Sequence, residues 1–337
     1  MDSLENFLLE IKSENSVEEV EKNTKNYYET IIPFYKSTGT SEEFKGVDDF
    51  PITCRTFHAK NPIAKVILCT GYNESYLKYC ELIYNLYEFG ISVYCFDHRG
   101  QGFSGRFPKQ EKRGYVDKFS NYINDLSYFF EHVASHQSQL PVFLLAHSMG
   151  GAITALAVHE KKINPNGIIL CAPMFEIMVA PYHFLELPIY ALASLFCKVN
   201  LENKYAVGQT DCIPFRPFEG NDVTHCLFRY QVWRKHISEI EDLQIGGPTY
   251  GWLKESIKAS VKARNITNIS NIPVLLLQAE ADTVVRNSAQ DLFLKNNPHC
   301  EFAVLEFAKH EILMETNNIR NKALNLIQNF ITKRIEK

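Results

Sequence analysis

The chain contains the stretch Leu144-Leu145-Ala146-His147-Ser148-Met149-Gly150-Gly151, which decides its fold. Apolar residues 142–145 lead directly into Ser148, and apolar residues at helical spacing follow over residues 152–158. The pattern predicts a strand, a sharp turn with a serine at its tip, and a helix. Such a turn strains the serine backbone and exposes its hydroxyl above the edge of a sheet. The backbone N–H of Met149 would then face a developing oxyanion.

The residues around the serine are small, as this turn requires. Strand and helix approach closely there, so a larger side chain would clash. The common form of the motif is Gly-x-Ser-x-Gly, and Ala146 departs from it by one methyl group. The five residues alone also describe a glycine-rich turn with an incidental serine, so the strand and helix on either side carry the prediction.

Length and composition indicate one globular α/β core with an insertion. The chain has 337 residues, of which 45% are hydrophobic and 22% charged, enough apolar material for a large core. The net charge of -4 argues against nucleic acid as the main partner.

Cysteine usage and the N-terminus indicate where the protein works. Nine cysteines are scattered along the chain without a Cys-x-x-Cys pair, so neither a zinc knuckle nor a redox motif is offered. Several lie within apolar strands, and we expect a reducing compartment. The first residues lack a secretory signal, and no run approaches the roughly 20 apolar residues of a membrane span. We expect a cytoplasmic protein, soluble or peripheral on the inner face of the membrane.

Strand and helix patterns alternate over most of the chain. Residues 1–34 form a helical lead-in, and residues 35–174 and 268–337 form the core. Strands are predicted over 52–57, with a possible hairpin partner before it, and over 64–69, 91–96, 167–171, 273–278 and 302–307. Helices are predicted over 119–135, 289–295 and 318–331. This alternation predicts a mostly parallel sheet covered by helices on both faces. Residues 175–267 break the rhythm with aromatic clusters and prolines, which predicts an inserted, mainly helical cap domain.

A serine, an aspartate and a histidine, the residue types of a nucleophilic serine site, each follow a predicted strand. Serine needs a general base, and the base needs an orienting acid. Ser148, Asp282 and His310 stand at strand ends, where ligands bind in this sheet type. Ser148 would attack an acyl carbonyl, His310 would transfer its proton, and Asp282 would orient the imidazole. The second oxyanion donor is expected from the Gly71-Tyr72 turn, as the N–H of Tyr72 beside that of Met149.

Other residues compete for these roles. Glu280 is a rival acid two residues before Asp282. His147 adjoins the serine, but neighbouring side chains at a strand end point apart, so a structural role is favoured. Asp97 follows a strand and is given a supporting role in its loop. Glu311 beside His310 hints at a metal motif, yet the chain has no His-Glu-x-x-His. His310 is one of eleven histidines, so it could also be a surface residue.

The chain resembles the α/β-hydrolase family of monoacylglycerol lipases and lysophospholipases, most of all the lysophospholipases of Gram-negative inner membranes. The resemblance covers the chain from the first core strands to the closing helix. It is carried by seven blocks: Glu74-Ser75-Tyr76-x-Lys78-Tyr79, Asp97-His98-Arg99-Gly100-Gln101-Gly102-x-Ser104-Gly105-Arg106, Leu145-Ala146-His147-Ser148-Met149-Gly150-Gly151-Ala152-Ile153, Ala172-Pro173-Met174-Phe175, Gly246-Gly247-Pro248-Thr249-Tyr250-x-Trp252, Leu276-Leu277-Gln278-Ala279-Glu280 and His310-Glu311-Ile312-Leu313. The block ending at Trp252 is the most telling, because caps differ between subfamilies.

The resemblance implies an α/β-hydrolase fold and a lysophospholipase that hydrolyses the one acyl ester left on a glycerol backbone. It implies no metal or organic cofactor. The substrate would be a lysophospholipid or a monoacylglycerol, with peripheral membrane contact through the cap. Thr70-Gly71 replaces the usual His-Gly before the oxyanion turn, which leaves the identity of the second donor open. The alternatives are a carboxylesterase, a peptidase of the same clan, or an inactive binding protein of this fold.

Overall fold

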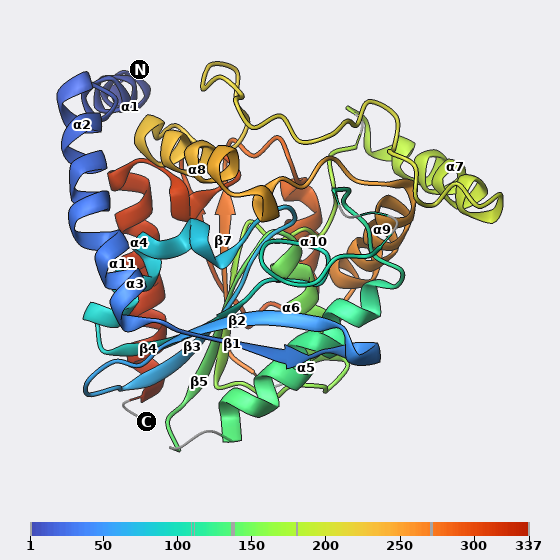
Figure 1. Cartoon of the computed structure of the whole chain (residues 1–337), viewed down its shortest axis with the longest axis horizontal. Coiled ribbons are helices and arrows are strands. Elements are labelled where there is room, and N and C mark those ends of the chain that lie inside the picture. The colour runs from blue at the N-terminus through green and yellow to red at the C-terminus, as the bar shows by residue number, and fades with distance from the viewer. Residues whose placement is uncertain are drawn as a thin grey trace.

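The computed structural model describes residues 2–108, 110, 112–135, 139–179, 181–269 and 272–335. One sheet runs through these residues in the strand order β1-β2-β4-β3-β5-β6-β7-β8 (Figure 1). The strands are β1 (Thr40–Lys45), β2 (Pro51–Phe57), β3 (Ala64–Cys69), β4 (Ile91–Phe96), β5 (Val142–His147), β6 (Gly167–Cys171), β7 (Val274–Ala279) and β8 (Glu301–Leu305). β1 and β2 are antiparallel to their neighbours, and β3 to β8 are parallel.

The predicted strands agree closely with the observed ones. The structure gives 64–69, 91–96 and 167–171 the predicted bounds, and the predicted partner of the strand at 52–57 is β1. The last strand ends at Leu305 rather than at residue 307, because Phe307 turns out of the sheet with a φ of 60°. The expected mostly parallel sheet is therefore confirmed.

Helices cover both faces of the sheet. The described helices longer than one turn are α1 (Asp2–Glu14), α2 (Val17–Asn26), α3 (Ile32–Thr38), α4 (Cys80–Glu88), α5 (Phe119–Ser135), α6 (Met149–His159), α7 (Glu186–Lys198), α8 (Leu227–Glu239), α9 (Tyr250–Arg264), α10 (Asn287–Asn296) and α11 (Asn317–Ile335). Side chains alternate along each strand. Val66 and Leu68 of β3 therefore join the core under α4 and α11, while Ile67 and Cys69 join the core under α5 and α6.

The helical lead-in packs on the core. A π-helical turn, Tyr27–Ile31, joins α2 to α3, and α3 extends past residue 34 to Thr38. Tyr27, Ile31 and Tyr35 are buried in the same core as α4. The lead-in also reaches α8, because the Asn15 side chain accepts the Leu227 N–H at 2.9 Å.

The segment predicted as a cap contains α7, α8 and α9, with long loops between them. Trp252 and Ala263 of α9 and Phe228 and Val232 of α8 are buried in the cores of the sheet. α7 packs on α9 in a separate apolar cluster and lies at the opposite end of the molecule from α1 and α2 (Figure 1). The exact domain bounds remain a prediction.

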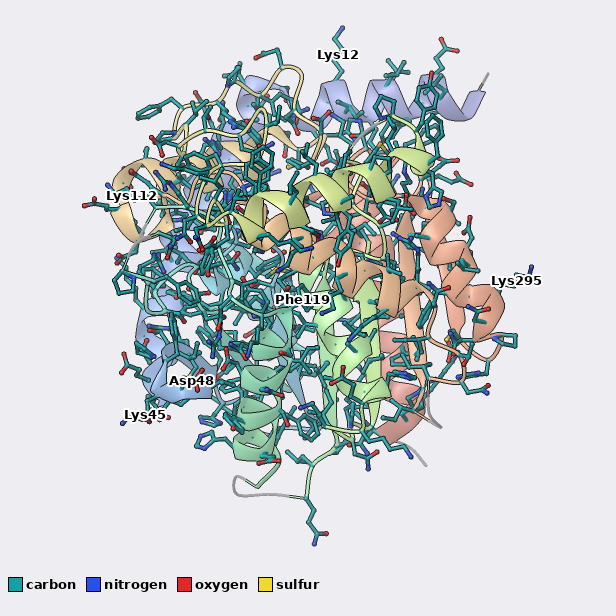
Figure 2. The ribbon with its side chains drawn as sticks, turned by 90° about the vertical axis from the view of Figure 1, so that its right-hand side faces the viewer. Lys12, Lys45, Asp48, Lys112, Phe119 and Lys295 are labelled. Carbon is teal, nitrogen blue, oxygen red and sulfur yellow. The ribbon has the colours of Figure 1, made fainter. Side chains whose placement is uncertain are left out.

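Charged side chains such as Lys12, Lys45 and Lys295 point away from the ribbon (Figure 2). All nine cysteines are unpaired thiols. Among the described residues, no helix combines the length and the apolar character that crossing a bilayer requires.

An ion pair fastens α8 to α4 and generates a pH-dependent prediction. Arg229 of α8 donates to Glu81 of α4 through Nε and Nη2, both at 2.7 Å. Burial raises the pKa of Glu81, but Arg320 and Arg229 outweigh burial and lower it from 4.5 to about 2. Since the folded-state pKa lies below the unfolded value, the contribution to stability exists above about pH 4.5 and is lost as pH falls toward 2.

We therefore expect Glu81→Gln to lower the free energy of unfolding by about 1.5–3 kcal/mol at neutral pH. The difference from wild type should shrink as pH falls through the acidic range. Urea unfolding at a series of pH values measures it, with Glu88→Gln, an exposed glutamate of the same helix, as the control. An equal loss at acidic and neutral pH would contradict this account.

Candidate active site

The three predicted residues form one hydrogen-bonded chain. His310 Nε2 lies 2.9 Å from Ser148 Oγ, and His310 Nδ1 lies 2.8 Å from Asp282 Oδ2. Ser148 follows β5, Asp282 follows β7, and His310 follows β8, so the parallel sheet brings them to one edge. All three are buried, which strengthens each polar contact by excluding water. The arrangement can activate a serine hydroxyl as a nucleophile.

Ser148 occupies the strained turn that the sequence predicts. Its φ of 50° and ψ of -115° are rare for a residue with a side chain and cost about 1–3 kcal/mol. Met149 begins α6 immediately afterwards. A Cβ on Gly150 would lie 2.2 Å from the Cys69 carbonyl oxygen, so only glycine lets α6 approach β3 this closely. Ala146, buried within β5, fits in the sheet despite its extra methyl.

Asp282, rather than Glu280, accepts the hydrogen bond from His310. Its other oxygen, Oδ1, accepts the N–H groups of Val284 at 2.8 Å and Val285 at 3.0 Å. Burial raises the pKa of Asp282, but His310 and these N–H groups outweigh it and hold the pKa below its usual value. Asp282 can therefore remain ionised beside a protonated imidazole. Glu280 is exposed, and its carboxylate accepts the Phe307 N–H instead of a hydrogen bond from His310.

The backbone N–H groups of Tyr72 and of Met149, the residue after Ser148, have no acceptor within the described chain. The neighbouring Gly71 N–H is already committed, because it donates to Glu74 Oε2 at 2.5 Å. The sequence left open which residue of the Gly71-Tyr72 turn supplies the second oxyanion donor. This contact distinguishes the two, because the Gly71 N–H is already bound. It makes Tyr72 the available partner of Met149 for an oxyanion.

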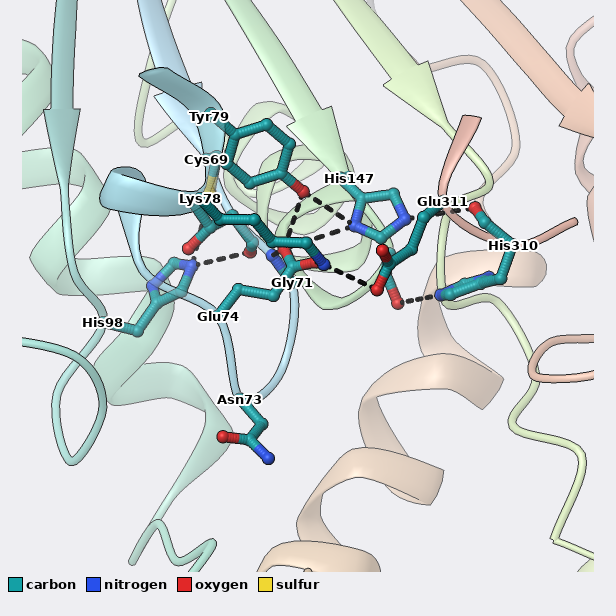
Figure 3. Close-up of polar contacts among 12 residues, drawn as sticks. Cys69, Gly71, Asn73, Glu74, Lys78, Tyr79, His98, His147, His310 and Glu311 are labelled. Atoms are coloured by element: carbon teal, nitrogen blue, oxygen red, sulfur yellow. Dashed lines mark hydrogen bonds and ion pairs between the residues drawn. The ribbon is translucent and has the colours of Figure 1, made fainter. Parts of the chain in front are cut away.

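A buried charge network holds both sides of the site (Figure 3). Glu74 Oε2 also lies 3.3 Å from His147 Nδ1 and accepts Tyr79 OH at 2.8 Å. His147 Nε2 donates to the His310 carbonyl oxygen at 3.2 Å. Glu74 therefore connects the oxyanion turn to the backbone of His310.

The charges in this network stabilise one another. Burial raises the pKa of Glu74, but Lys78 and His147 outweigh it and hold the pKa well below the usual value. Burial lowers the pKa of His147, yet Glu74 raises it more, so the net pKa is above the usual value. A protonated imidazole donates from both nitrogens, which fits its contacts with Glu74 and with the His310 carbonyl. His147 thus has the structural role that the sequence favoured.

The loop after β4 also supports the oxyanion turn through Gln101 and His98, two residues that were not assigned roles from sequence. Gln101 Oε1 accepts the Asn73 N–H at 2.8 Å, and His98 Nε2 donates to the Thr70 carbonyl oxygen at 3.0 Å. Burial lowers the pKa of His98 to about 4, so the ring is neutral at physiological pH. The sequence signal that could have revealed these roles was the family resemblance over residues 74–79 and 97–106, because these two blocks contain Glu74, His98 and Gln101.

Asp97 has the supporting role that the sequence predicted. It follows β4 and is fully buried. Oδ1 accepts the Tyr76 N–H, and Oδ2 accepts the Ser75 hydroxyl and the Phe103 N–H, each at 2.8 Å. Asp97 therefore fastens its own loop to the segment that follows the oxyanion turn.

The block ending at Trp252 packs directly on the oxyanion turn. The Tyr72 ring lies 4.2 Å from the Trp252 ring, and Tyr72 OH donates to the Gly246 carbonyl oxygen at 3.1 Å. The Asn73 side chain donates to the Ile245 carbonyl oxygen at 3.0 Å. The cap segment thus helps to hold the backbone of Tyr72 in place.

One group of residues outside this site has the geometry of metal ligands, Glu176, His183 and Glu186. Arginines already pair with its carboxylates. Arg264 lies 2.6 Å from Glu186, and Arg286 lies 2.9 Å from Glu176. We interpret the group as an ion-pair cluster. Glu311, the sequence hint of a metal motif, pairs with Lys78 at 2.5 Å.

Comparison with known proteins also indicates a hydrolase. The family model described as Serine aminopeptidase, S33, matches residues 60–317. Lysophospholipase L2 of Escherichia coli K12 is 35% identical over 298 residues, which cover 86% of this chain and 87% of that protein. Monoglyceride lipase of Rattus norvegicus is 26% identical and covers 81% of this chain and 84% of its own.

Solved structures share the fold. A soluble variant of monoglyceride lipase from Saccharomyces cerevisiae superposes with a TM-score of 0.71 and 18% identity, over 88% of this chain and 96% of its own. A carboxyl esterase from Bacillus coagulans superposes with a TM-score of 0.69 and 15% identity, over 88% and 99% of the two chains. The expected α/β-hydrolase fold is confirmed, and the chain belongs to the serine aminopeptidase S33 family.

Proposed function

We propose that the protein is a serine hydrolase that cleaves the acyl ester of lysophospholipids through an acyl-enzyme intermediate. The observation that carries the proposal is the buried hydrogen-bonded chain of Ser148, His310 and Asp282 at the strained turn. A nucleophile, a base and an orienting acid in this order are what acyl transfer requires.

Each residue has a role in the proposed reaction. Ser148 Oγ attacks the ester carbonyl while His310 Nε2 removes its proton, and the N–H groups of Tyr72 and Met149 stabilise the oxyanion. His310 then protonates the leaving glycerol oxygen, which breaks the ester bond and leaves the acyl group on Ser148. Water, activated by His310, repeats the sequence and releases the fatty acid. Asp282 orients His310 and stabilises its cation throughout.

The choice of substrate rests on the relatives. A protein named lysophospholipase L2 aligns across most of this chain, while the monoglyceride lipases are less similar. Both names describe esters with one acyl chain on glycerol, so monoacylglycerol hydrolysis is the second candidate. The family description also keeps a peptidase in view. The intact geometry of Ser148, His310 and Asp282 argues against an inactive binding protein.

The first test measures turnover and covalent labelling. Purified protein should hydrolyse lysophosphatidylcholine and react with a fluorophosphonate probe, and Ser148→Ala should lose both, with turnover falling at least about 10⁴-fold. Monoacylglycerol, a short p-nitrophenyl ester and an aminoacyl amide complete the panel. No turnover and no labelling by wild type would overturn the proposal. Turnover of short esters or amides alone would indicate a carboxylesterase or a peptidase.

A second test separates the two candidate acids. Asp282→Asn should lower kcat roughly 10³–10⁴-fold, because the amide favours the wrong imidazole tautomer. Glu280→Gln, two residues away and exposed, should keep the wild-type rate. Steady-state kinetics on one ester substrate measures both variants. The reverse order of effects would contradict the assignment of Asp282.

We also propose that the protein contacts a phospholipid bilayer through α7 and the segment before it. Large apolar side chains are exposed there: Phe184 is 70% exposed, Leu187 73% and Leu195 58%. Lys258 and Lys262 of α9 line the same groove as Phe184 and Leu187, which suits anionic lipids. The unpaired thiols favour a reducing compartment, hence the cytoplasmic face of that bilayer.

Leu187→Glu combined with Leu195→Glu should abolish cosedimentation with anionic phospholipid vesicles, because it places charge on the inserting face. Turnover of a soluble short-chain ester should not change, since both side chains are exposed. Leu9→Glu, an exposed leucine of α1, is the matched control. Vesicle binding that is equal in wild type and the double variant would contradict membrane contact through α7.

A further inference from the structure

A cavity of about 470 Å³, lined by both charged and apolar residues, lies beside the oxyanion turn. Tyr72 and Asn73 form one wall, and Glu311, the residue after His310, belongs to another. Val284, whose N–H donates to Asp282, also lines it. The remaining wall comes from residues 216–223 and from α8. Ser148, Asp282 and His310 do not line the cavity themselves, and it adjoins the site through the oxyanion turn and through the neighbours of Asp282 and His310.

The position of the cavity indicates which part of the substrate enters it. His310 gives its proton to the leaving alcohol, so the alcohol must lie on the side of His310. In a lysophospholipid, that alcohol is the glycerol backbone with its phosphate headgroup. The cavity is thus placed to receive the headgroup and not the acyl chain.

The charges in the deep part of the cavity already have partners. Lys78 Nζ lies 2.7 Å from Glu74 and 2.5 Å from Glu311. Arg229 is paired with Glu81. These groups are neutralised by the protein itself and leave little net charge for a ligand. Recognition of a charged headgroup has to come from other residues.

Two arginines at the outer wall are placed differently. Arg234 of α8 is fixed, because its Nε and Nη2 donate to the Pro214 and Ile213 carbonyl oxygens. Arg216 lies on the preceding loop, whose Pro217 carbonyl oxygen accepts Tyr230 OH at 2.8 Å. The Arg216 guanidinium is exposed and has no acceptor within the described chain.

Arg216 and Arg234 both line this cavity, so their like charges oppose each other across a shared space. Burial lowers the pKa of Arg234, and the nearby charge of Arg216 lowers it further. An anion between them would remove this repulsion, and guanidinium groups match phosphate oxygens with paired hydrogen bonds. Glu219 and Asp222 line the same cavity, so a purely anionic ligand meets some opposing charge. A phosphate that carries an ammonium group complements both pairs.

We propose that Arg216 and Arg234 bind the phosphate of the lysophospholipid headgroup and thereby select phosphate esters over neutral glycerol esters. The inference rests on the proposed function. It assigns this outer cavity wall the choice between the two candidate substrates, while the chemistry remains with Ser148, His310 and Asp282.

The test compares two soluble substrates with the same short acyl chain, a lysophosphatidylethanolamine and a monoacylglycerol, below their micelle concentrations and without vesicles. The double variant Arg216→Gln, Arg234→Gln should lower kcat/KM for the lysophospholipid at least about tenfold. It should leave kcat/KM for the monoacylglycerol unchanged. Lys235→Gln, one residue along α8 and outside the cavity lining, is the matched control.

Each outcome decides the matter. If the double variant leaves the ratio of the two kcat/KM values unchanged, with or without an equal fall for both substrates, the headgroup site is overturned while the hydrolase proposal stands. A wild type that turns over neither substrate overturns the proposed function itself. Because the substrates are monomeric and no bilayer is present, a selective loss cannot come from weaker binding to a membrane surface.

A product analogue distinguishes headgroup binding from binding of free phosphate. Glycerophosphoethanolamine should inhibit monoacylglycerol hydrolysis by wild type competitively and should inhibit the double variant several-fold more weakly. Inorganic phosphate should inhibit wild type much less, because it lacks the glycerol and ammonium groups. Equal inhibition by inorganic phosphate would overturn recognition of a lipid headgroup.

Discussion

The hydrogen bond between His310 Nε2 and Ser148 Oγ is the contact on which the rest of the site depends. It joins residues 162 positions apart in the chain, and it forms only because parallel strands bring their carboxyl ends to one edge. Two local features make this contact possible. The strained backbone of Ser148 forms the sharp turn between β5 and α6, and the missing side chain of Gly150 lets α6 approach β3. The sheet supplies the free energy that maintains the strain.

The oxyanion turn is held from three directions. Glu74 binds the Gly71 N–H from within the turn, Gln101 binds Asn73 from the loop after β4, and the cap segment binds Tyr72 through Trp252 and Gly246. Oxyanion stabilisation depends on donors that need no rearrangement during the reaction. The segment predicted as a cap and the core therefore both hold the turn that carries Tyr72, the proposed oxyanion donor. Burial of α8 and α9 in the cores of the sheet explains how this segment can help to fix the backbone there.

Much of this was accessible from the sequence, for identifiable physical reasons. Strands β3, β4 and β6 are largely apolar along their whole length because helices bury both of their faces. Ser148, Asp282 and His310 each follow a predicted strand, and this shared position predicted a site that no single motif indicated. The sequence could not show which aromatic residues of the cap segment are buried. Phe184 and Trp252 are both large aromatic residues, yet Phe184 is exposed and Trp252 is buried because other elements pack against it.

The polar network was also beyond the sequence. Glu74 and Lys78 are four residues apart, but Glu311 approaches them only in space, and nothing in the spacing shows that the Glu74 carboxylate contacts both Gly71 and His147. Likewise, Arg216 and Arg234 look like surface charges until the fold places them beside one cavity. Long-range electrostatics of this kind depends on the tertiary structure, whereas apolar periodicity is local.

The proposed mechanism requires Ser148 to carry the acyl group between two half-reactions. The most direct measurement is mass spectrometry of the protein after rapid mixing with a lysophospholipid and acid quenching within a turnover. The account predicts a protein species heavier by one acyl group, with the modified peptide containing Ser148 and with no such species in Ser148→Ala. Fatty acid released at the full rate without an adduct, or an adduct on another residue, would contradict it.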